Sequence, residues 1–185
     1  MSVSQHRTTP KADQELAWFP ILVYHRVVPS VEGRDPYHLC TSVKEFQAQI
    51  RYLRKSGYHV VSLESAVCDL LKGGRPKKKQ VAITFDDGYM DFFTHALSVL
   101  KVNQFTATVF LVSQQLGGTN IWDQGKAPEA PLMGLAQVKE AQQHGITFGS
   151  HSATHRRLPA IPEEEGRREI GGSKAALERL LEVPV

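Results

Sequence analysis

The sequence has few cysteines and no long apolar run. Its 185 residues include two cysteines, Cys40 and Cys68, and their spacing matches no cysteine-based metal site. Cys68 lies within an apolar pattern and is expected to be a small core residue. No apolar stretch approaches the roughly 20 residues that span a bilayer. The sequence therefore predicts no transmembrane segment and gives no reason to expect an oxidising compartment.

Strong charge of one sign is also missing. The formal net charge is +3, which is too small to indicate a nucleic-acid or anionic-membrane partner. The one basic run, residues 75–79 (RPKKK), is interpreted as a solvated loop, with contact to a polyanion as the lesser alternative. Residues 1–18 are polar and aperiodic, without the apolar core of a signal peptide, and are predicted to be a disordered leader. A cytoplasmic protein is the expectation.

The rest of the chain, residues 19–185, is predicted to be one α/β domain. Strand patterns alternate five times with helix patterns. Ser42 and Glu45 form a capping-box pattern at the start of the first helix. The expected strands cover 21–25, 59–63, 81–85, 105–112 and 146–149, and the expected helices cover 43–56, 64–72, 92–102, 134–144 and a segment from 162. The alternation predicts a parallel sheet, either open or curved into an incomplete (β/α) barrel, because a closed barrel takes about eight such units.

Residues 81–88 (VAITFDDG) join an apolar strand pattern to two adjacent carboxylates. A continuous apolar run is typical of a strand buried on both faces, and ligands bind at the carboxyl ends of such strands. Asp86 and Asp87 repel each other unless a cation or a shared proton relieves them. The stretch therefore indicates a metal site, whereas the alternative is a simple turn leading into a helix.

His151 and His155 follow another strand with i, i+4 spacing, which on a helical turn would place both imidazoles on one face. Both this pair and the Asp pair come directly after buried strands, so they should lie at the same end of one parallel sheet. Two imidazoles and one carboxylate make a three-ligand metal site with open positions, and the second carboxylate could act as a base. Residues 113–131 form a long loop, in which Trp122 is interpreted as a packing residue, with sugar stacking as the alternative.

Residues 84–88 (TFDDG), followed by residues 151–155 (HSATH), resemble the first two motifs of the polysaccharide deacetylases, carbohydrate esterase family four. The resemblance covers roughly residues 19–185. It implies a distorted, incomplete (β/α) barrel that removes acetyl groups, mostly N-acetyl groups from glucosamine polymers, with a divalent metal. An acetylated polysaccharide is thus the expected partner, and the sequence specifies no oligomeric state.

The resemblance also implies roles for individual residues. Asp86 would be the catalytic base, and Asp87, His151 and His155 would be the metal ligands, most often to zinc, with cobalt or nickel as alternatives. In the branch similar to poly-N-acetylglucosamine deacetylases, a Tyr-His pair on the first strand takes the place of the general acid. Residues 24–27 (YHRV) match that pattern, so His25 is the candidate acid, against a role as a hydrogen-bonded packing residue.

The chain departs from the family pattern at its C-terminal end. Relatives continue beyond the equivalent of residues 183–185 into strands that carry further motifs, so the domain is expected to lack its C-terminal strands. Two alternatives to an N-deacetylase follow from the sequence. One is a weakly active or inactive remnant that binds metal or glycan, and the other is an O-acetyl esterase on xylan-type glycans.

Overall fold

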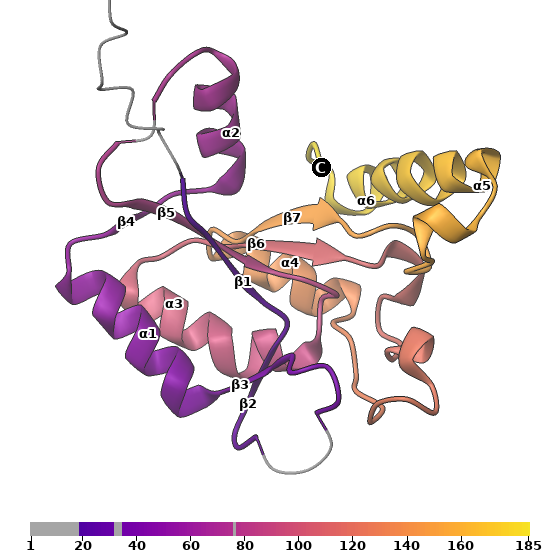
Figure 1. Ribbon diagram of the computed structural model, residues 1–185, viewed down its shortest axis with the longest axis horizontal. Coiled ribbons are helices and arrows are strands. Elements are labelled where there is room, and N and C mark those ends of the chain that lie inside the picture. Colours follow the sequence, from indigo (N-terminus) through magenta and orange to yellow (C-terminus); the bar gives the residue numbers. More distant parts are fainter. Residues whose placement is uncertain (1–18, 32–34, 76) are drawn as a thin grey trace, which may run out of the picture.

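The computed structural model describes residues 19–31, 35–75 and 77–185. The predicted leader, residues 1–18, lies outside the described residues. The elements alternate along the chain as the sequence pattern predicts (Figure 1). In order they are β1 (Ile21–Tyr24), β2 (Arg26–Val28), β3 (Cys40–Ser42), α1 (Val43–Lys55), β4 (His59–Val60), α2 (Leu63–Leu71), β5 (Gln80–Phe85), η1 (Phe92–Ala96), α3 (Leu97–Asn103), β6 (Thr108–Leu111), η2 (Ser113–Gln115), η3 (Ile121–Asp123), α4 (Leu135–Gln143), β7 (Thr147–Ser150), η4 (Leu158–Ala160), α5 (Glu163–Arg167), η5 (Arg168–Gly172) and α6 (Ser173–Leu181).

The main sheet is parallel and open. Its strand order is β1-β5-β6-β7, and the short β4 pairs with the start of β5. Figure 1 shows α1 and α3 side by side, with α6 running along β7. The described strands do not close into a barrel, which confirms the expected parallel α/β sheet. Because all strands run the same way, the segments that follow β1, β5, β6 and β7 emerge at one edge of the sheet.

Strand β5 lies at the centre of the core. Its residues from Val81 to Phe85 are at most 3% exposed, which confirms the expectation of a strand buried on both faces. Phe85 stacks on Tyr24 of β1 and meets Phe46 of α1 and Phe92 of η1 edge-on. This aromatic cluster packs directly beneath the end of β5 and gives the residues after it a rigid base.

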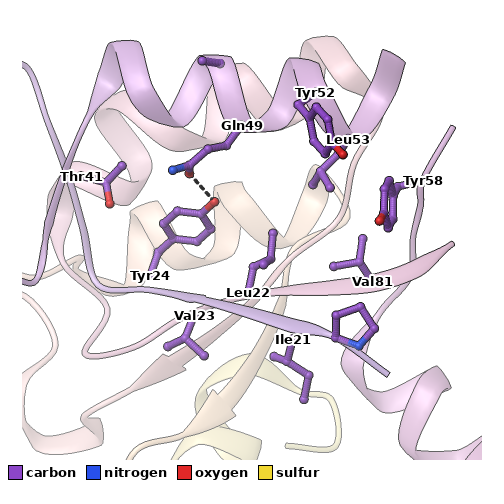
Figure 2. Close-up of a pocket in the computed structure, with 12 residues that line it drawn as sticks. Ile21, Leu22, Val23, Tyr24, Thr41, Gln49, Tyr52, Leu53, Tyr58 and Val81 are labelled. Carbon is purple, nitrogen blue, oxygen red and sulfur yellow. Dashed lines mark hydrogen bonds between the residues drawn. The ribbon is translucent and has the colours of Figure 1, made fainter. Parts of the chain in front are cut away.

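The apolar pattern of residues 21–25 (ILVYH) predicts a buried first strand, but β1 is only partly buried. Ile21 and Val23 are 46% and 56% exposed, because the described ladder joins β1 to β5 on one side only. Figure 2 shows Tyr24 pointing towards α1, where its hydroxyl donates a hydrogen bond of 2.6 Å to Gln49 Oε1, while Ile21 and Val23 point the other way. Burial raises the pKa of the Tyr24 phenol to about 12, so the hydroxyl remains a donor. An apolar groove of about 940 Å³ lies between β1 and α1.

Two further expectations are corrected. Cys68 is exposed rather than a core residue, because helix α2 turns Ala66, not Cys68, to the interior. The β structure also extends beyond the predicted first strand, residues 21–25, because β2 begins at Arg26 and pairs with β3 in a separate parallel ladder. That ladder leads into α1, whose predicted capping box is present at Ser42 and Glu45.

Two helical segments begin or break with a wider turn. The π-helical turn η1 precedes α3, and the π-helical turn η5 separates α5 from α6 and includes the Gly171–Gly172 pair. Such turns carry one extra residue and are frequent at functional sites. Among the described residues, no helix combines the length and apolar character needed to cross a membrane.

Candidate active site

The two aspartates follow β5 directly. The Asp86 amide continues the ladder by donating to the Tyr24 carbonyl at 2.9 Å. Asp87 and Gly88 then adopt left-handed backbone angles, with φ of 70° and 73°. A Cβ at Gly88 would lie 2.6 Å from the Leu111 side chain, so glycine is required for close packing against β6. This turn buries the Asp87 side chain and leaves Asp86 partly exposed.

The histidines lie in a loop that follows β7, not on the helical turn that their spacing suggested. Residues 151–155 are irregular, and Ser152 and His155 have left-handed φ angles of 65° and 61°. The His151 amide donates to the Leu111 carbonyl at 2.9 Å, which ties the loop to the end of β6. The tertiary fold, rather than helical periodicity, thus brings both imidazoles to one side.

Asp87, His151 and His155 converge. Their ligand atoms all lie within 4.8 Å of one another. His151 Nε2 and His155 Nε2 lie 3.3 and 3.2 Å from Asp87 Oδ1, while that buried oxygen accepts no hydrogen bond of good geometry. A tetrahedral ion with bonds of about 2.1 Å would separate its ligand atoms by about 3.4 Å. The donor set and its spacing therefore fit a divalent metal ion, which would give the unpartnered Asp87 oxygen a partner.

Asp86 and His25 lie beside this cluster. His25 Nε2 is 3.9 Å from Asp86 Oδ2, and the two side chains are 26% and 22% exposed. They come from the ends of adjacent strands, since His25 follows β1 and Asp86 follows β5. Asp86 interacts through its charge with His25 and with all three candidate ligands, so it lies close to both.

The two carboxylates are pushed in opposite directions by their surroundings. Burial raises the pKa of Asp86, although His151 and His25 oppose that effect. Burial alone would also raise the pKa of Asp87. The hydrogen-bonding and charge interactions of His151 and His155 outweigh that effect and hold the pKa of Asp87 well below its ordinary value. Asp87 in turn raises the pKa of His151. Paired carboxylates with diverging pKa values are typical of acid–base sites.

Glu169 supports the histidine loop, and sequence reasoning missed it. This buried side chain accepts hydrogen bonds from the Ala153 amide at 2.9 Å, the Thr154 amide at 2.8 Å and the Thr154 hydroxyl at 2.6 Å. It lies on the π-helical turn η5, within an exposed and highly charged segment. From sequence alone, a glutamate in such a segment is interpreted as a solvated side chain, so only the fold reveals its role.

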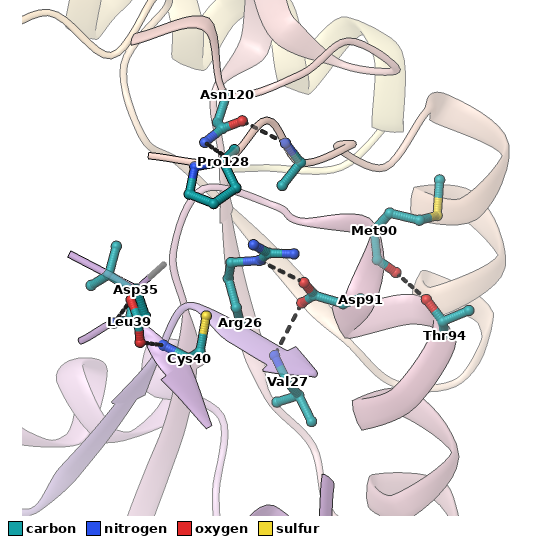
Figure 3. Close-up of polar contacts among 11 residues, drawn as sticks. Arg26, Val27, Asp35, Leu39, Cys40, Met90, Asp91, Thr94, Asn120 and Pro128 are labelled. Carbon is teal, nitrogen blue, oxygen red and sulfur yellow. Dashed lines mark hydrogen bonds and ion pairs between the residues drawn. The ribbon is translucent and has the colours of Figure 1, made fainter. Parts of the chain in front are cut away.

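The ion pair between Arg26 and Asp91 was also missed. Arg26 Nε donates to Asp91 Oδ2 at 2.8 Å, and the Val27 amide donates to Asp91 Oδ1 at 3.1 Å (Figure 3). Arg26 also lies over the Tyr89 ring, 5.1 Å from its centroid. The pair joins the segment after His25 to the segment after Asp87, and burial raises the pKa of Asp91 against the effect of Arg26.

Trp122 forms a wall beside the site. Its ring stacks on His155 with centroids 4.5 Å apart and packs against the small cluster of Tyr89, Ala130 and Leu132. The packing contacts that the sequence suggested are thus present, with a candidate metal ligand as an unexpected partner, while sugar stacking stays an untested alternative. Asn120 shapes the same loop through a hydrogen bond to the Pro128 carbonyl, which Figure 3 shows, and through one that it accepts from the Ala130 amide.

The sequence and the fold match known proteins. A family model described as "Polysaccharide deacetylase" matches residues 73–185. YxkH of Bacillus subtilis (strain 168), a protein named for the same family, is 30% identical over 178 residues, which cover 92% of this chain and 58% of YxkH. The poly-β-1,6-N-acetyl-D-glucosamine N-deacetylase of Staphylococcus epidermidis is 30% identical over 142 residues, which cover 71% of this chain and 47% of that protein. The chain thus spans about half the length of these curated relatives.

Solved structures agree. The Streptococcus pyogenes deacetylase PplD, determined in complex with acetate, has a TM-score of 0.74 and 30% identity, covering 89% of this chain and 69% of PplD. IcaB from Ammonifex degensii has a TM-score of 0.74 at 24% identity, covering 90% of this chain and 71% of IcaB, and so supports the fold alone.

Proposed function

The chain belongs to the polysaccharide deacetylase family, and on that premise we propose that it removes N-acetyl groups, by hydrolysis of their amide bonds, from a polysaccharide that contains N-acetylglucosamine. The observation that carries the proposal is the convergence of three ligand-type side chains, a second carboxylate and a further histidine at one edge of the sheet. The names of two relatives, a poly-β-1,6-N-acetyl-D-glucosamine N-deacetylase and a peptidoglycan-N-acetylglucosamine deacetylase of Bacillus cereus, support the substrate class.

Asp87, His151 and His155 would hold a divalent ion, with zinc as the expected metal. When bound, such an ion acts as a Lewis acid and makes water a stronger nucleophile near neutral pH. The buried Asp87 carboxylate supplies one negative charge and remains ionised, because its pKa is lowered. His151 and His155 would supply the other two ligands through their imidazole nitrogens.

Asp86 would act as the general base. Its carboxylate takes a proton from the water that attacks the acetyl carbonyl carbon. The raised pKa of Asp86 suits this role, because a base works best when its pKa approaches the working pH. His25 would donate a proton to the amide nitrogen as the carbon–nitrogen bond breaks, so that the products are acetate and a free amino sugar.

Acetate release tests this function. The full chain with added zinc or cobalt is incubated with an N-acetylglucosamine oligomer, beside Asp86→Asn and the matched control Asp69→Asn, an exposed carboxylate on α2. We expect Asp86→Asn to lower the rate by at least about 100-fold, the lower range for losing a general base, while metal content stays at one ion per chain. Asp69→Asn should leave the rate unchanged.

Other outcomes would contradict the proposal. Undiminished release by Asp86→Asn would exclude Asp86 as the base. No release from a chain that holds one metal ion would favour a non-catalytic module. Faster release from an O-acetylated xylan oligomer than from the N-acetylated one would favour an esterase.

A further inference from the structure

A second groove adjoins the histidine loop. It has a volume of about 610 Å³, and His151 and His155 form part of its wall together with Trp122. The remaining wall comes from η3 and the segment after it, from serines beside His151, from the segment after His155, and from one residue each of η5 and α6. A glycan whose acetamido group reached the candidate ligands could place a neighbouring sugar in this groove.

The groove is unusually basic. Four of its lining residues are cationic, namely Lys126, Arg156, Arg157 and Lys174, whereas Asp123 is its one carboxylate. The lining residues carry a formal charge of +3, four cations less one carboxylate, before the partners of two of these cations are counted. The cations come from three separate segments, and the tertiary fold therefore assembles the charge.

Two of these cations have local partners. Arg156 pairs with Glu165 at 2.9 Å, and Lys174 pairs with Glu178 at 2.7 Å. Lys126 and Arg157 take part in no ion pair within the described part of the chain, and both are exposed. They are available to an anionic ligand, and Arg157 can offer a bidentate contact to carboxylate or phosphate.

We infer that the groove selects a glycan that carries an anionic group, a carboxylate or a phosphate, within a sugar or two of the acetamido group. The inference rests on the proposed function and narrows its substrate class, because poly-β-1,6-N-acetylglucosamine itself has no anionic group. Trp122 and Leu158 supply apolar surface for the sugar ring, while Lys126 and Arg157 recognise the charge. Exposed charge pairs are individually weak, so the groove acts through two cations together.

Binding of three matched tetrasaccharides tests the inference. The probes are the neutral N-acetylglucosamine tetramer, a tetramer with alternate lactyl carboxylates, and a 6-phosphorylated tetramer. Zinc-loaded Asp86→Asn protein prevents turnover during calorimetry. We expect one anionic tetramer to bind about 10-fold more tightly than the neutral one, with the preference shrinking at high salt. Which tetramer binds more tightly identifies carboxylate or phosphate as the recognised group.

The variant Lys126→Gln/Arg157→Gln should abolish the preference and keep neutral binding within about two-fold. The matched control is Lys55→Gln/Lys72→Gln, which removes the same charge at the ends of α1 and α2, near the opposite edge of the sheet. Circular dichroism and thermal melting verify that all variants fold. Equal binding of the three probes, no binding of any of them, or a preference that survives in Lys126→Gln/Arg157→Gln would overturn the inference.

Acetate release separates this inference from the proposed function. Release from the neutral tetramer by the unmodified chain, without any anionic preference in binding, overturns the groove assignment alone. An anionic preference in binding, without release from any tetramer, overturns the proposed hydrolysis and upholds the groove assignment.

Discussion

The two segments that supply the candidate ligands are held in place by different means. The aspartate segment, residues 86–88, continues a buried strand, and its backbone remains hydrogen-bonded to β1. The histidine loop, residues 151–155, follows the four-residue strand β7 and depends on contacts from distant parts of the chain, above all from Glu169. A ligand that directly follows a central strand is positioned by the strand ladder. A ligand in an irregular loop needs a partner that accepts the hydrogen bonds of the loop backbone.

Removing a ligand from either segment should have the largest effect. We expect Asp87→Ala and His155→Ala each to weaken zinc binding by more than about 100-fold, because three protein ligands become two. Titration against a competing chelator measures this change. His59→Ala, an exposed histidine on β4, is the matched control and should bind zinc normally. Normal zinc binding by His155→Ala would rule out the three-residue site.

Removing Glu169 should have the next largest effect, confined to the histidine loop. Glu169→Ala leaves the Ala153 and Thr154 amides without their acceptor. We expect about 1–3 kcal/mol lower free energy of unfolding and about 10- to 100-fold weaker zinc binding. Chemical denaturation and zinc titration test this. Glu164→Ala, whose carboxylate is exposed and pairs only with Arg168 in the described chain, should change neither. Unaltered zinc affinity in Glu169→Ala would show that the histidine loop keeps its conformation without Glu169.

Breaking the ion pair behind the aspartate segment should affect stability more than metal binding. Asp91→Asn weakens the contacts with Arg26 and the Val27 amide, and we expect about 1–3 kcal/mol lower free energy of unfolding. Zinc affinity should change by less than about three-fold, below the usual effect of a residue that orients a ligand, because the strand ladder still places Asp87. A loss of zinc affinity as large as that of Glu169→Ala would remove the contrast between the two segments.

The smallest effect should appear as a pH dependence of stability. Burial opposes ionisation of Glu169, but hydrogen bonds from Thr154 and Ala153 outweigh it and lower the pKa of this carboxyl. A carboxyl with a lowered folded-state pKa stabilises the fold above its ordinary pKa of 4.5, and that contribution disappears as pH falls through the folded-state value. The unmodified chain should therefore lose more stability than Glu169→Gln between pH 5 and about pH 3. Denaturation series at several pH values compare the two, and parallel curves would contradict the prediction.

Local sequence patterns were enough to predict the order of the elements and the chemistry at the strand ends. An uninterrupted apolar run predicts β5, and the aspartates at its end have no local partner that would neutralise them. The two histidines after β7 complete the set, because parallel strands place their carboxyl ends at one edge of the sheet. Those inferences need only local patterns and the direction of the strands.

The surroundings of those residues, in contrast, depend on the packing of the folded chain. The sequence pattern predicts a buried first strand and a helical turn for the histidines. In the structure, β1 is a partly exposed edge strand and the histidines lie in a loop. Glu169 and the Arg26–Asp91 pair carry no local signature, because their partners are 15 or more residues away along the chain. Periodicity reports which face of an element is apolar. Contacts between distant polar groups depend on how the elements pack, and so they appear only in the folded chain.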